Sequence, residues 1–130
     1  MKLLLREDGW EQVFALWERA ESLATASISY VEARSALAAA ARAGRLGAGA
    51  LRSARAALEE LWRDVDVVNF HSRLVQPAGD VAEFYRLRSH DALHLTSALT
   101  LGDPELVLVS WDGELRRAGA EAGLAVAPAP

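Results

Sequence analysis

The chain has 130 residues, 52% of them hydrophobic, which suits one compact domain over residues 1–130. The formal net charge of −4 provides no global positive field, so any nucleic acid has to meet a local basic surface. The lack of cysteine excludes disulfides, thiol nucleophiles and thiolate metal sites. Because no apolar run is long enough to span a bilayer, we expect a cytoplasmic protein without a membrane segment.

The first half of the chain predicts helices separated by short strands. Trp10, Val13, Phe14 and Trp17 recur at helical spacing. Gly44 follows an Ala-rich stretch in a position suited to a left-handed C-cap. The predicted elements are a helix at 10–22, a strand at 23–29, an αα-hairpin of helices at 30–43 and 51–62, and a strand at 65–70.

The second half continues the alternation. The stretch 71–87 has a helical pattern, but Pro77 and Gly79 predict a break into two short helices. The remaining predictions are a helix at 91–101, a strand at 106–110, a helix at 114–122 and an edge strand at 124–128. Strands alternating with helices favour an α/β fold with a mostly parallel sheet flanked by helices.

Three acids stand near predicted helix starts, where capping is the simplest explanation for each. Ser29 and Glu32 have capping-box spacing, and Asp112 stands directly before a helix. Asp91 begins its helix, with Ser89 as a competing cap, but it also shares the apolar stripe with residues four and seven positions later. A structural domain whose acids are only caps is therefore one interpretation.

Taken together, the three acids favour a metal site. In a right-handed parallel layout, helices that follow strands begin at the carboxyl edge of the sheet, where such folds bind ligands. Carboxylates crowded at one edge repel each other unless a cation neutralises them, and hard oxygen ligands suit Mg²⁺ or Mn²⁺. The chemistry this implies is metal-assisted hydrolysis of a phosphodiester.

Three segments resemble one family in the right order. SYVEARSAL at 29–37, DALHLTSAL at 91–99 and VLVSWDGELRRAGAEAGLAV at 107–126 are similar to the PIN-domain family, specifically the VapC toxins of bacterial VapBC toxin–antitoxin pairs. The resemblance implies a three-layer PIN-like sandwich and an endoribonuclease that uses Mg²⁺ or Mn²⁺. It assigns the catalytic and metal-binding roles to Glu32, Asp91 and Asp112, with Ser110 as a supporting partner.

The resemblance also implies partners. These are an RNA substrate such as transfer RNA, a cognate VapB-type antitoxin docking on the helical region with Arg34 to Arg55, and a second copy in a homodimer. Arg116 and Arg117, just beyond Asp112, are the candidates for contacts with RNA phosphate.

One departure from the family concerns the start of the chain. PIN domains begin with a central strand ending in an aspartate, and MKLLLRED aligns with the tail of that motif, so we expect the strand and its acid to be missing. The strands at 23–29 and 106–110 then pair directly, receive a strand from another chain, or belong to a longer gene product. The alternative function is a catalytically impaired PIN-like protein that binds antitoxin or RNA without cleaving it.

Overall fold

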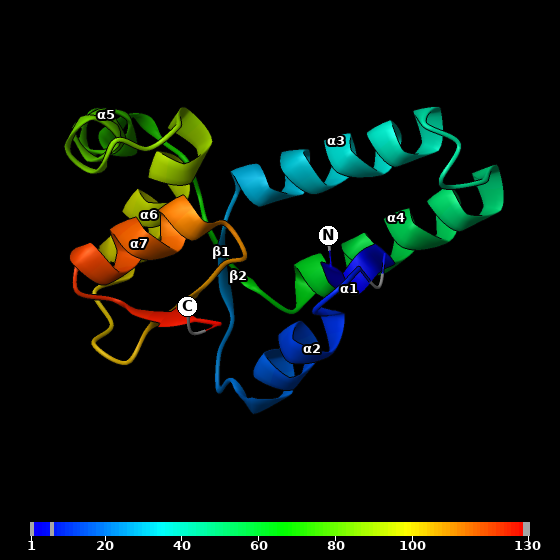
Figure 1. Ribbon diagram of the computed structural model, residues 1–130, viewed down its shortest axis with the longest axis horizontal. Helices are drawn as coiled ribbons and strands as arrows, with labels where there is room; N and C mark the ends of the chain where they lie inside the picture. Colours follow the sequence, from blue (N-terminus) through cyan, green and yellow to red (C-terminus); the bar gives the residue numbers. More distant parts are fainter. Residues whose placement is uncertain (1, 6, 129–130) are drawn as a thin grey trace. The chain divides into compact units, whose positions relative to one another are not determined.

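The computed structural model describes residues 2–5 and 7–128, with Met1 and Arg6 of the opening segment outside the described residues. By internal contacts the chain divides into unit 1, up to Val67, and unit 2, from Val68 (Figure 1). The expectation of a single domain over 1–130, and that of a missing first strand, stay predictions.

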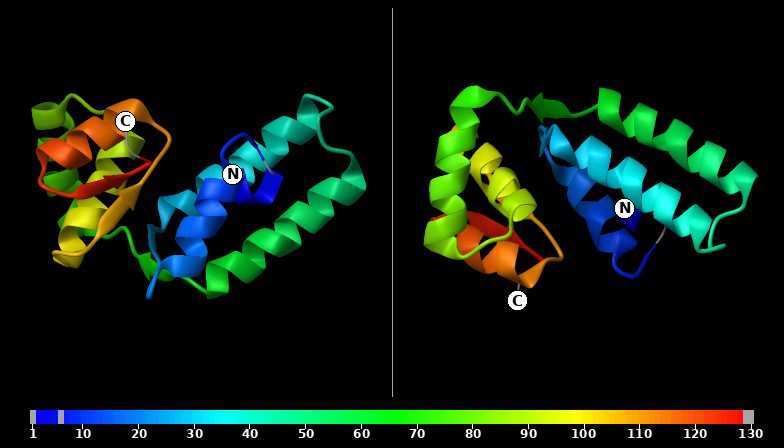
Figure 2. Two further views of the ribbon diagram at one scale, coloured as in Figure 1. Left: turned by 60° about the horizontal axis from the view of Figure 1, so that its bottom comes forward. Right: turned by 90° about the horizontal axis from the view of Figure 1, so that it is seen from above.

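Unit 1 is mainly helical and contains the predicted αα-hairpin. Its elements are α1 (Lys2–Leu5), α2 (Trp10–Arg19), β1 (Ala24–Ala26), α3 (Ile28–Arg42) and α4 (Ala48–Arg63). Figure 2 shows α3 and α4 running antiparallel beside each other. Leu37 of α3 is fully buried, and with Ala33 it packs against Ala54 and Leu58 of α4. Small residues on both helices allow this close packing.

The turn after α3 confirms the predicted role of Gly44. Its φ is 71°, in the left-handed region that glycine adopts without steric cost. The Gly44 N–H donates to the Ala41 carbonyl, and the Arg45 N–H donates to the Ala40 carbonyl at 2.9 Å. This is a Schellman motif, which satisfies the last carbonyls of the helix and turns the chain toward α4.

A polar network also joins α3 to α4. The Tyr30 hydroxyl donates to Glu59 Oε1 at 2.5 Å and accepts from Arg34 Nη1 at 2.8 Å. The Tyr30 ring packs edge-on against Trp62, with centroids 5.2 Å apart. These contacts fix the N-terminal half of α3, the part of the helix that carries Glu32.

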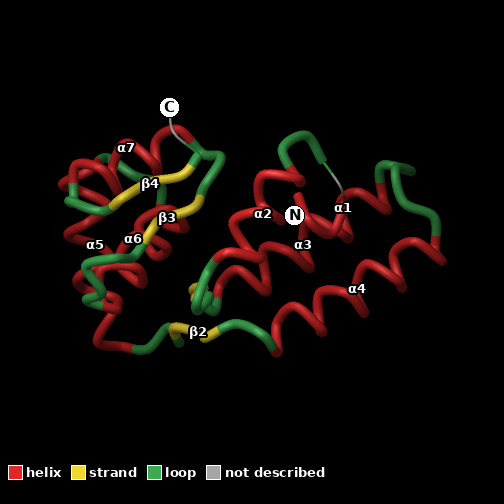
Figure 3. Tube along the Cα trace, turned by 90° about the horizontal axis from the view of Figure 1, so that it is seen from below, coloured by secondary structure: helices red, strands yellow, loops and turns green. Residues whose placement is uncertain are grey.

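Unit 2 holds the other helices around a parallel pair of strands. Its elements are α5 (Ser72–Tyr85), α6 (Ser89–Leu101), β3 (Val107–Val109), α7 (Gly113–Glu121) and β4 (Ala125–Ala127). β3 and β4 are parallel, with Leu108 opposite Val126, and lie side by side in Figure 3. The predicted edge strand is thus confirmed, and it ends before Pro128.

Helix α7 packs closely on this pair of strands. A Cβ added at Gly119 would lie 2.5 Å from a side-chain carbon of Leu108 and 3.3 Å from one of Val126. A larger residue at this position would therefore force the Leu108 side chain to move, because α7 packs closely on the strands. Leu115 and Ala118 of α7 share an apolar cluster with Leu95 of α6.

The predicted break at Pro77 is wrong, because α5 is one helix with Pro77 inside it. Proline cannot donate to the carbonyl four residues earlier, which here is that of Arg73. Both residues are exposed, so water can satisfy this carbonyl. The opposite face of α5 buries Leu74 and Ala78, and α5 packs extensively on α6, which stabilises a continuous helix.

The strands are shorter than predicted and form two pairs. β1 pairs with β2 (Asp66–Val68), which spans the boundary between the units, and β3 pairs with β4. The predicted strand at 23–29 is wrong at its end, because α3 already begins at Ile28. Helices and short strands alternate as expected of an α/β fold, and β3 and β4 are parallel. None of the helices in the described part of the chain has the length and apolar character needed to cross a membrane.

Candidate metal centre

Asp91 lies in the first turn of α6, on its buried face. The N-cap residue is Arg88, which makes no side-chain cap hydrogen bond, so Asp91 is the third residue of the helix. The prediction that Asp91 or Ser89 caps this helix is therefore wrong. Asp91 is only 5% exposed, and Leu95, one turn later on the same face, is fully buried. Helix capping therefore does not explain why Asp91 lies on the apolar face of α6.

Among the described residues, the charge of Asp91 is compensated by His90 and by its place in the first turn of α6, where the helix dipole favours an acid. Its ion-pair partner among the described residues is His90, whose Nε2 lies 3.5 Å from Asp91 Oδ2, and no lysine or arginine of this part of the chain pairs with it. Burying an ionised carboxylate is costly unless a cation or hydrogen-bond donors compensate. A buried carboxylate that pairs with no lysine or arginine of the described residues fits a site that binds a cation.

Asp112 is the N-cap of α7, as predicted. Its Oδ1 accepts hydrogen bonds from the backbone N–H groups of Glu114, at 2.9 Å, and Leu115, at 3.0 Å. Both bonds use the same oxygen, and Oδ2 makes no hydrogen bond to any residue that the structure describes. Capping thus orients the carboxylate and leaves one oxygen for a ligand, so the two roles are compatible.

Ser110 connects the end of the sheet to Asp112. Its N–H donates to the Ala127 carbonyl at 2.9 Å, which extends the pairing of β3 and β4 by one residue. Its Oγ accepts from the Asp112 N–H at 3.1 Å. The hydroxyl therefore holds the backbone of the capping residue in place at the end of β3.

The two candidate RNA-binding arginines differ in what they already contact. Arg117 pairs with Glu121 at 2.9 Å and Glu114 at 3.0 Å, and donates to the Tyr85 carbonyl at 2.9 Å. The hydrogen bonds from Glu121 and then Glu114 raise the pKa of the Arg117 guanidinium. Arg116 makes a longer contact of 3.4 Å to the Ser110 carbonyl. Arg116 is consequently the better placed of the two to receive a phosphate.

Glu32 belongs to unit 1, in the second turn of α3, and is half-buried. The capping box is wrong, because Ser29 is the second residue of the helix and its hydroxyl lies 2.8 Å from that of Thr25. Ser27 is the N-cap residue. Glu32 is therefore an acid within the helix and has no capping role.

Asp91, Asp112 and Ser110 lie in unit 2, at the starts of two helices that share one apolar cluster. Leu95 follows Asp91 by four residues, Leu115 follows Asp112 by three, and both leucines belong to this cluster. Within either unit, no three described His, Asp or Glu side chains form a group that could hold a metal. Unit 2 thus supplies two acids of the expected set, and unit 1 carries Glu32.

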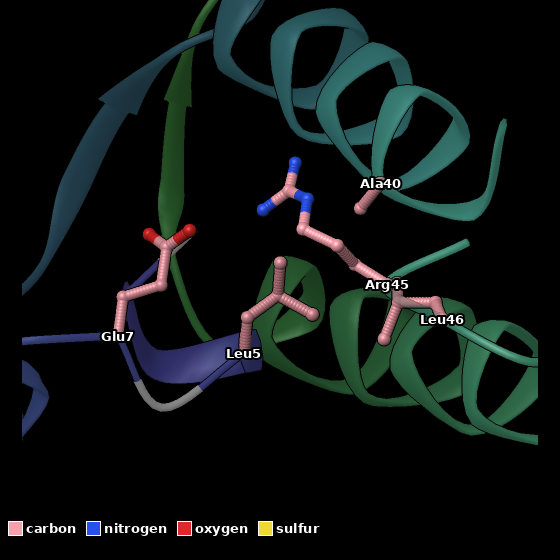
Figure 4. A pocket seen from close by; sticks show the side chains of 5 residues that line it. All are labelled: Leu5, Glu7, Ala40, Arg45 and Leu46. Carbon is pink, nitrogen blue, oxygen red and sulfur yellow. The ribbon is translucent and has the colours of Figure 1, made fainter. Parts of the chain in front are cut away.

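Two open cavities of unit 1 lie between α1 and the αα-hairpin. One has a volume of about 180 Å³ and is lined by Leu5, Glu7, Ala40, Arg45 and Leu46. Figure 4 shows these five side chains, with the charged groups of Glu7 and Arg45 among them. The other is an open groove of leucines and alanines along α4. None of the candidate metal ligands lines either cavity.

Comparison with known proteins agrees with the resemblance of the three motifs. Residues 1–121 match the PIN domain, a match that runs through both units. The chain is 40% identical over 129 residues to ribonuclease VapC45 of Mycobacterium tuberculosis (strain CDC 1551 / Oshkosh) and to ribonuclease VapC49 of Mycobacterium tuberculosis (strain ATCC 25618 / H37Rv). Each alignment covers 99% of this chain and 90% of the relative. The chain therefore belongs to the PIN-domain family, and within it to the VapC type.

Proposed function

We propose that this protein is a divalent-metal-dependent endoribonuclease, the toxin of a type II toxin–antitoxin pair. The observation that carries the proposal is the buried carboxylate of Asp91, which caps nothing and has only a histidine as its ion-pair partner among the described residues. The family match and two relatives named as ribonucleases give the class of reaction. We propose transfer RNA as the substrate class.

In this proposal Asp91 and Asp112 bind Mg²⁺ or Mn²⁺, and Glu32 is a further ligand or orients the attacking water. The bound metal would lower the pKa of its water and stabilise the leaving oxygen. The chain's own residues position the acids: Ser110 holds the backbone of Asp112, and the N–H groups at the start of α7 orient its carboxylate. Arg116 contacts a phosphate of the RNA.

Cleavage of a transfer-RNA pool tests this function. The protein should cut RNA with Mn²⁺ or Mg²⁺, and cleavage should stop when EDTA removes the metal. Arg116→Gln should weaken RNA binding and reduce its salt dependence by about one ion, because one phosphate contact is lost. Cleavage that persists in EDTA would contradict the metal-dependent reaction. A folded protein that binds RNA without cutting it would favour the impaired, binding-only alternative.

We further propose that the groove along α4 receives an amphipathic helix of a VapB-type antitoxin. Leu4, Leu5 and Leu46 line it together with alanines and Ser53 of α4, which gives a mainly apolar surface of the kind that binds the apolar face of a helix. Arg45 stands in the adjoining cavity and suits an acidic residue of such a partner. A second copy of the chain completes a homodimer in this proposal.

A pair of variants on α4 tests the docking surface. Ala50 is exposed and lines the groove, whereas Ala56 is exposed on the same helix but does not line it. Ala50→Glu should weaken binding of the antitoxin encoded beside this gene by about tenfold or more, since it places a charge in an apolar contact. Ala56→Glu should leave binding unchanged. Equal effects of the two substitutions would exclude this groove, and light scattering of the free protein measures the dimer.

A further inference from the structure

The αα-hairpin of α3 and α4 contains a long stretch without acidic residues. Residues 33–58 include no aspartate or glutamate, so all 18 acidic residues of the chain lie outside this stretch. Its basic residues are Arg34, Arg42, Arg45, Arg52 and Arg55. In a chain whose formal net charge is −4, this part of the hairpin is therefore a local positive surface.

All but one of these arginines are free of polar contacts with the described residues. The exception is Arg34, whose Nη1 donates to the Tyr30 hydroxyl at 2.8 Å and lies 3.8 Å from Glu59 Oε1. The other four are exposed, and their side chains form no hydrogen bond or ion pair within the part of the chain that the structure describes. Their guanidinium groups can therefore contact an anionic partner.

Arg52 and Arg55 lie on the side of α4 that faces away from the apolar groove. At 3.6 residues per turn, each is about 150° around the helix axis from the middle of the groove-lining positions, which include Ala50 and Ala57. Residues three apart on a helix are neighbours, so the two positive charges repel each other, and no carboxylate follows until Glu59. A polyanion would remove this repulsion.

The arginines gather in the half of the hairpin next to its turn. A Cβ added at Gly49 would lie 3.9 Å from Arg52 Nη2, so the Arg52 guanidinium extends back over the first turn of α4. Arg42 is the last residue of α3, and the two helices run side by side in Figure 2. Arg42, Arg52 and Arg55, called the arginine surface below, therefore belong to one end of the hairpin.

The surroundings of the arginine surface favour a nucleic acid over a protein. Among the described residues, no large hydrophobic side chain between Val31 and Phe70 is exposed. Protein interfaces depend on aromatic or aliphatic anchors that become buried. Binding to a phosphate backbone needs only positive charges, and a guanidinium can bind a phosphate through two parallel hydrogen bonds. The phosphates of an RNA strand are thus the partner whose chemistry fits.

We propose that the arginine surface binds the phosphate backbone of the RNA substrate and supplies affinity without taking part in the chemistry. The proposal rests on the proposed function, because it assigns a binding surface to the same RNA. The groove on the other side of α4 stays open to an apolar helix while RNA is bound. An acidic segment of a protein partner is the occupant that competes with RNA.

Binding of a transfer-RNA pool in EDTA tests this surface, because binding is then measured without cleavage. The double variant Arg52→Gln with Arg55→Gln removes two charges and keeps good helix formers. Its RNA affinity should fall by about tenfold at physiological salt, and the slope of log affinity against log salt should fall by about two. Its stability to urea should not fall, since two repelling charges are removed. With Mn²⁺ present, KM should rise while kcat stays unchanged.

The matched control is the double variant Arg19→Gln with Arg73→Gln, which removes the same charge from two exposed arginines outside the hairpin. It should change RNA affinity by less than about threefold. Equal effects of the two double variants, or an unchanged salt slope in Arg52→Gln with Arg55→Gln, would overturn the proposal. Loss of antitoxin binding with unchanged RNA binding would also overturn it, because the arginines would then serve a protein partner.

These measurements separate the failure of the arginine surface from the failure of the proposed function. Wild-type protein that binds RNA through these arginines but never cleaves it with Mn²⁺ would refute the nuclease and retain the surface. A protein that cleaves RNA, and whose binding does not respond to Arg52→Gln with Arg55→Gln, would refute the surface alone.

Discussion

The two roles of Asp112, helix cap and metal ligand, can be separated by substitution. Asp112→Ala removes both the cap and the carboxylate, whereas Asp112→Asn retains a side-chain oxygen at the position of Oδ1 but loses the charge. Asparagine and aspartate are about equally good N-caps. The two N–H···O bonds to Oδ1, of 2.9 and 3.0 Å, can therefore persist in the asparagine variant.

The magnitudes follow from these contacts. Asp112→Ala should lower the free energy of unfolding by about 1 kcal/mol, within a range of about 0.5–2 kcal/mol. Asp112→Asn should lower it by only about 0.3–1 kcal/mol, because the favourable interaction of a negative charge with the helix dipole is lost. Urea unfolding followed by circular dichroism measures both values. Metal-dependent RNA cleavage should be lost in both variants, in spite of their different stabilities.

Two results would refute this reasoning. An Asp112→Asn protein that cleaves RNA at the wild-type rate would show that the residue is only a cap. Equal stability of Asp112→Ala and wild-type protein would show that the two hydrogen bonds to the start of α7 contribute nothing.

Four further predictions concern stability and are measured by urea unfolding. Gly119→Ala should destabilise the protein by about 1 kcal/mol, because a clash with a side chain of β3, costing about 1–3 kcal/mol, exceeds the gain in helix propensity. Gly79→Ala, with open space around the new Cβ, should instead stabilise α5 by about 0.5–1 kcal/mol, and a shared sign would contradict the packing argument. Thr96→Val should stabilise by about 1 kcal/mol, since the buried Thr96 Oγ1 has no hydrogen-bond partner among the described residues; a loss of stability would indicate a partner outside them. Pro77→Ala should stabilise by about 1–2 kcal/mol by restoring a hydrogen bond to the Arg73 carbonyl, and an unchanged midpoint would mean that water satisfies that carbonyl fully.

The sequence predicted helices best where periodicity and end signals agreed. Gly44 closes α3 in a left-handed conformation, as its position indicated, and Gly102 adopts the same conformation at the end of α6. The failure at Pro77 has a physical reason, because local propensity cannot show that the exposed face of α5 tolerates an unpaired carbonyl while the other face packs on α6. The end of the strand at 23–29 was missed because β-branched Ile28 suits a strand but begins α3.

The candidate site was predicted unevenly. The cap at Asp112 follows from a strand, an acid and a helix in immediate succession, which are local signals. The capping roles assigned to Asp91 and to Ser29 with Glu32 were wrong, because each helix begins two or more residues before the acid. The contact of His90 with Asp91 was missed, since adjacent helical residues normally diverge and no ligand spacing marks the pair.

The central claim is that Asp91 is buried in order to bind a metal ion. The most direct measurement compares wild-type protein with Asp91→Asn in Mn²⁺ binding, in RNA cleavage and in the free energy of unfolding without metal. We expect binding and cleavage to be lost while the free energy of unfolding falls by no more than about 1 kcal/mol, because the removal of a buried charge offsets its lost interaction with the start of α6. An Asp91→Asn protein that still binds Mn²⁺ and cleaves RNA, or one that unfolds because the carboxylate is needed for the fold, would contradict it.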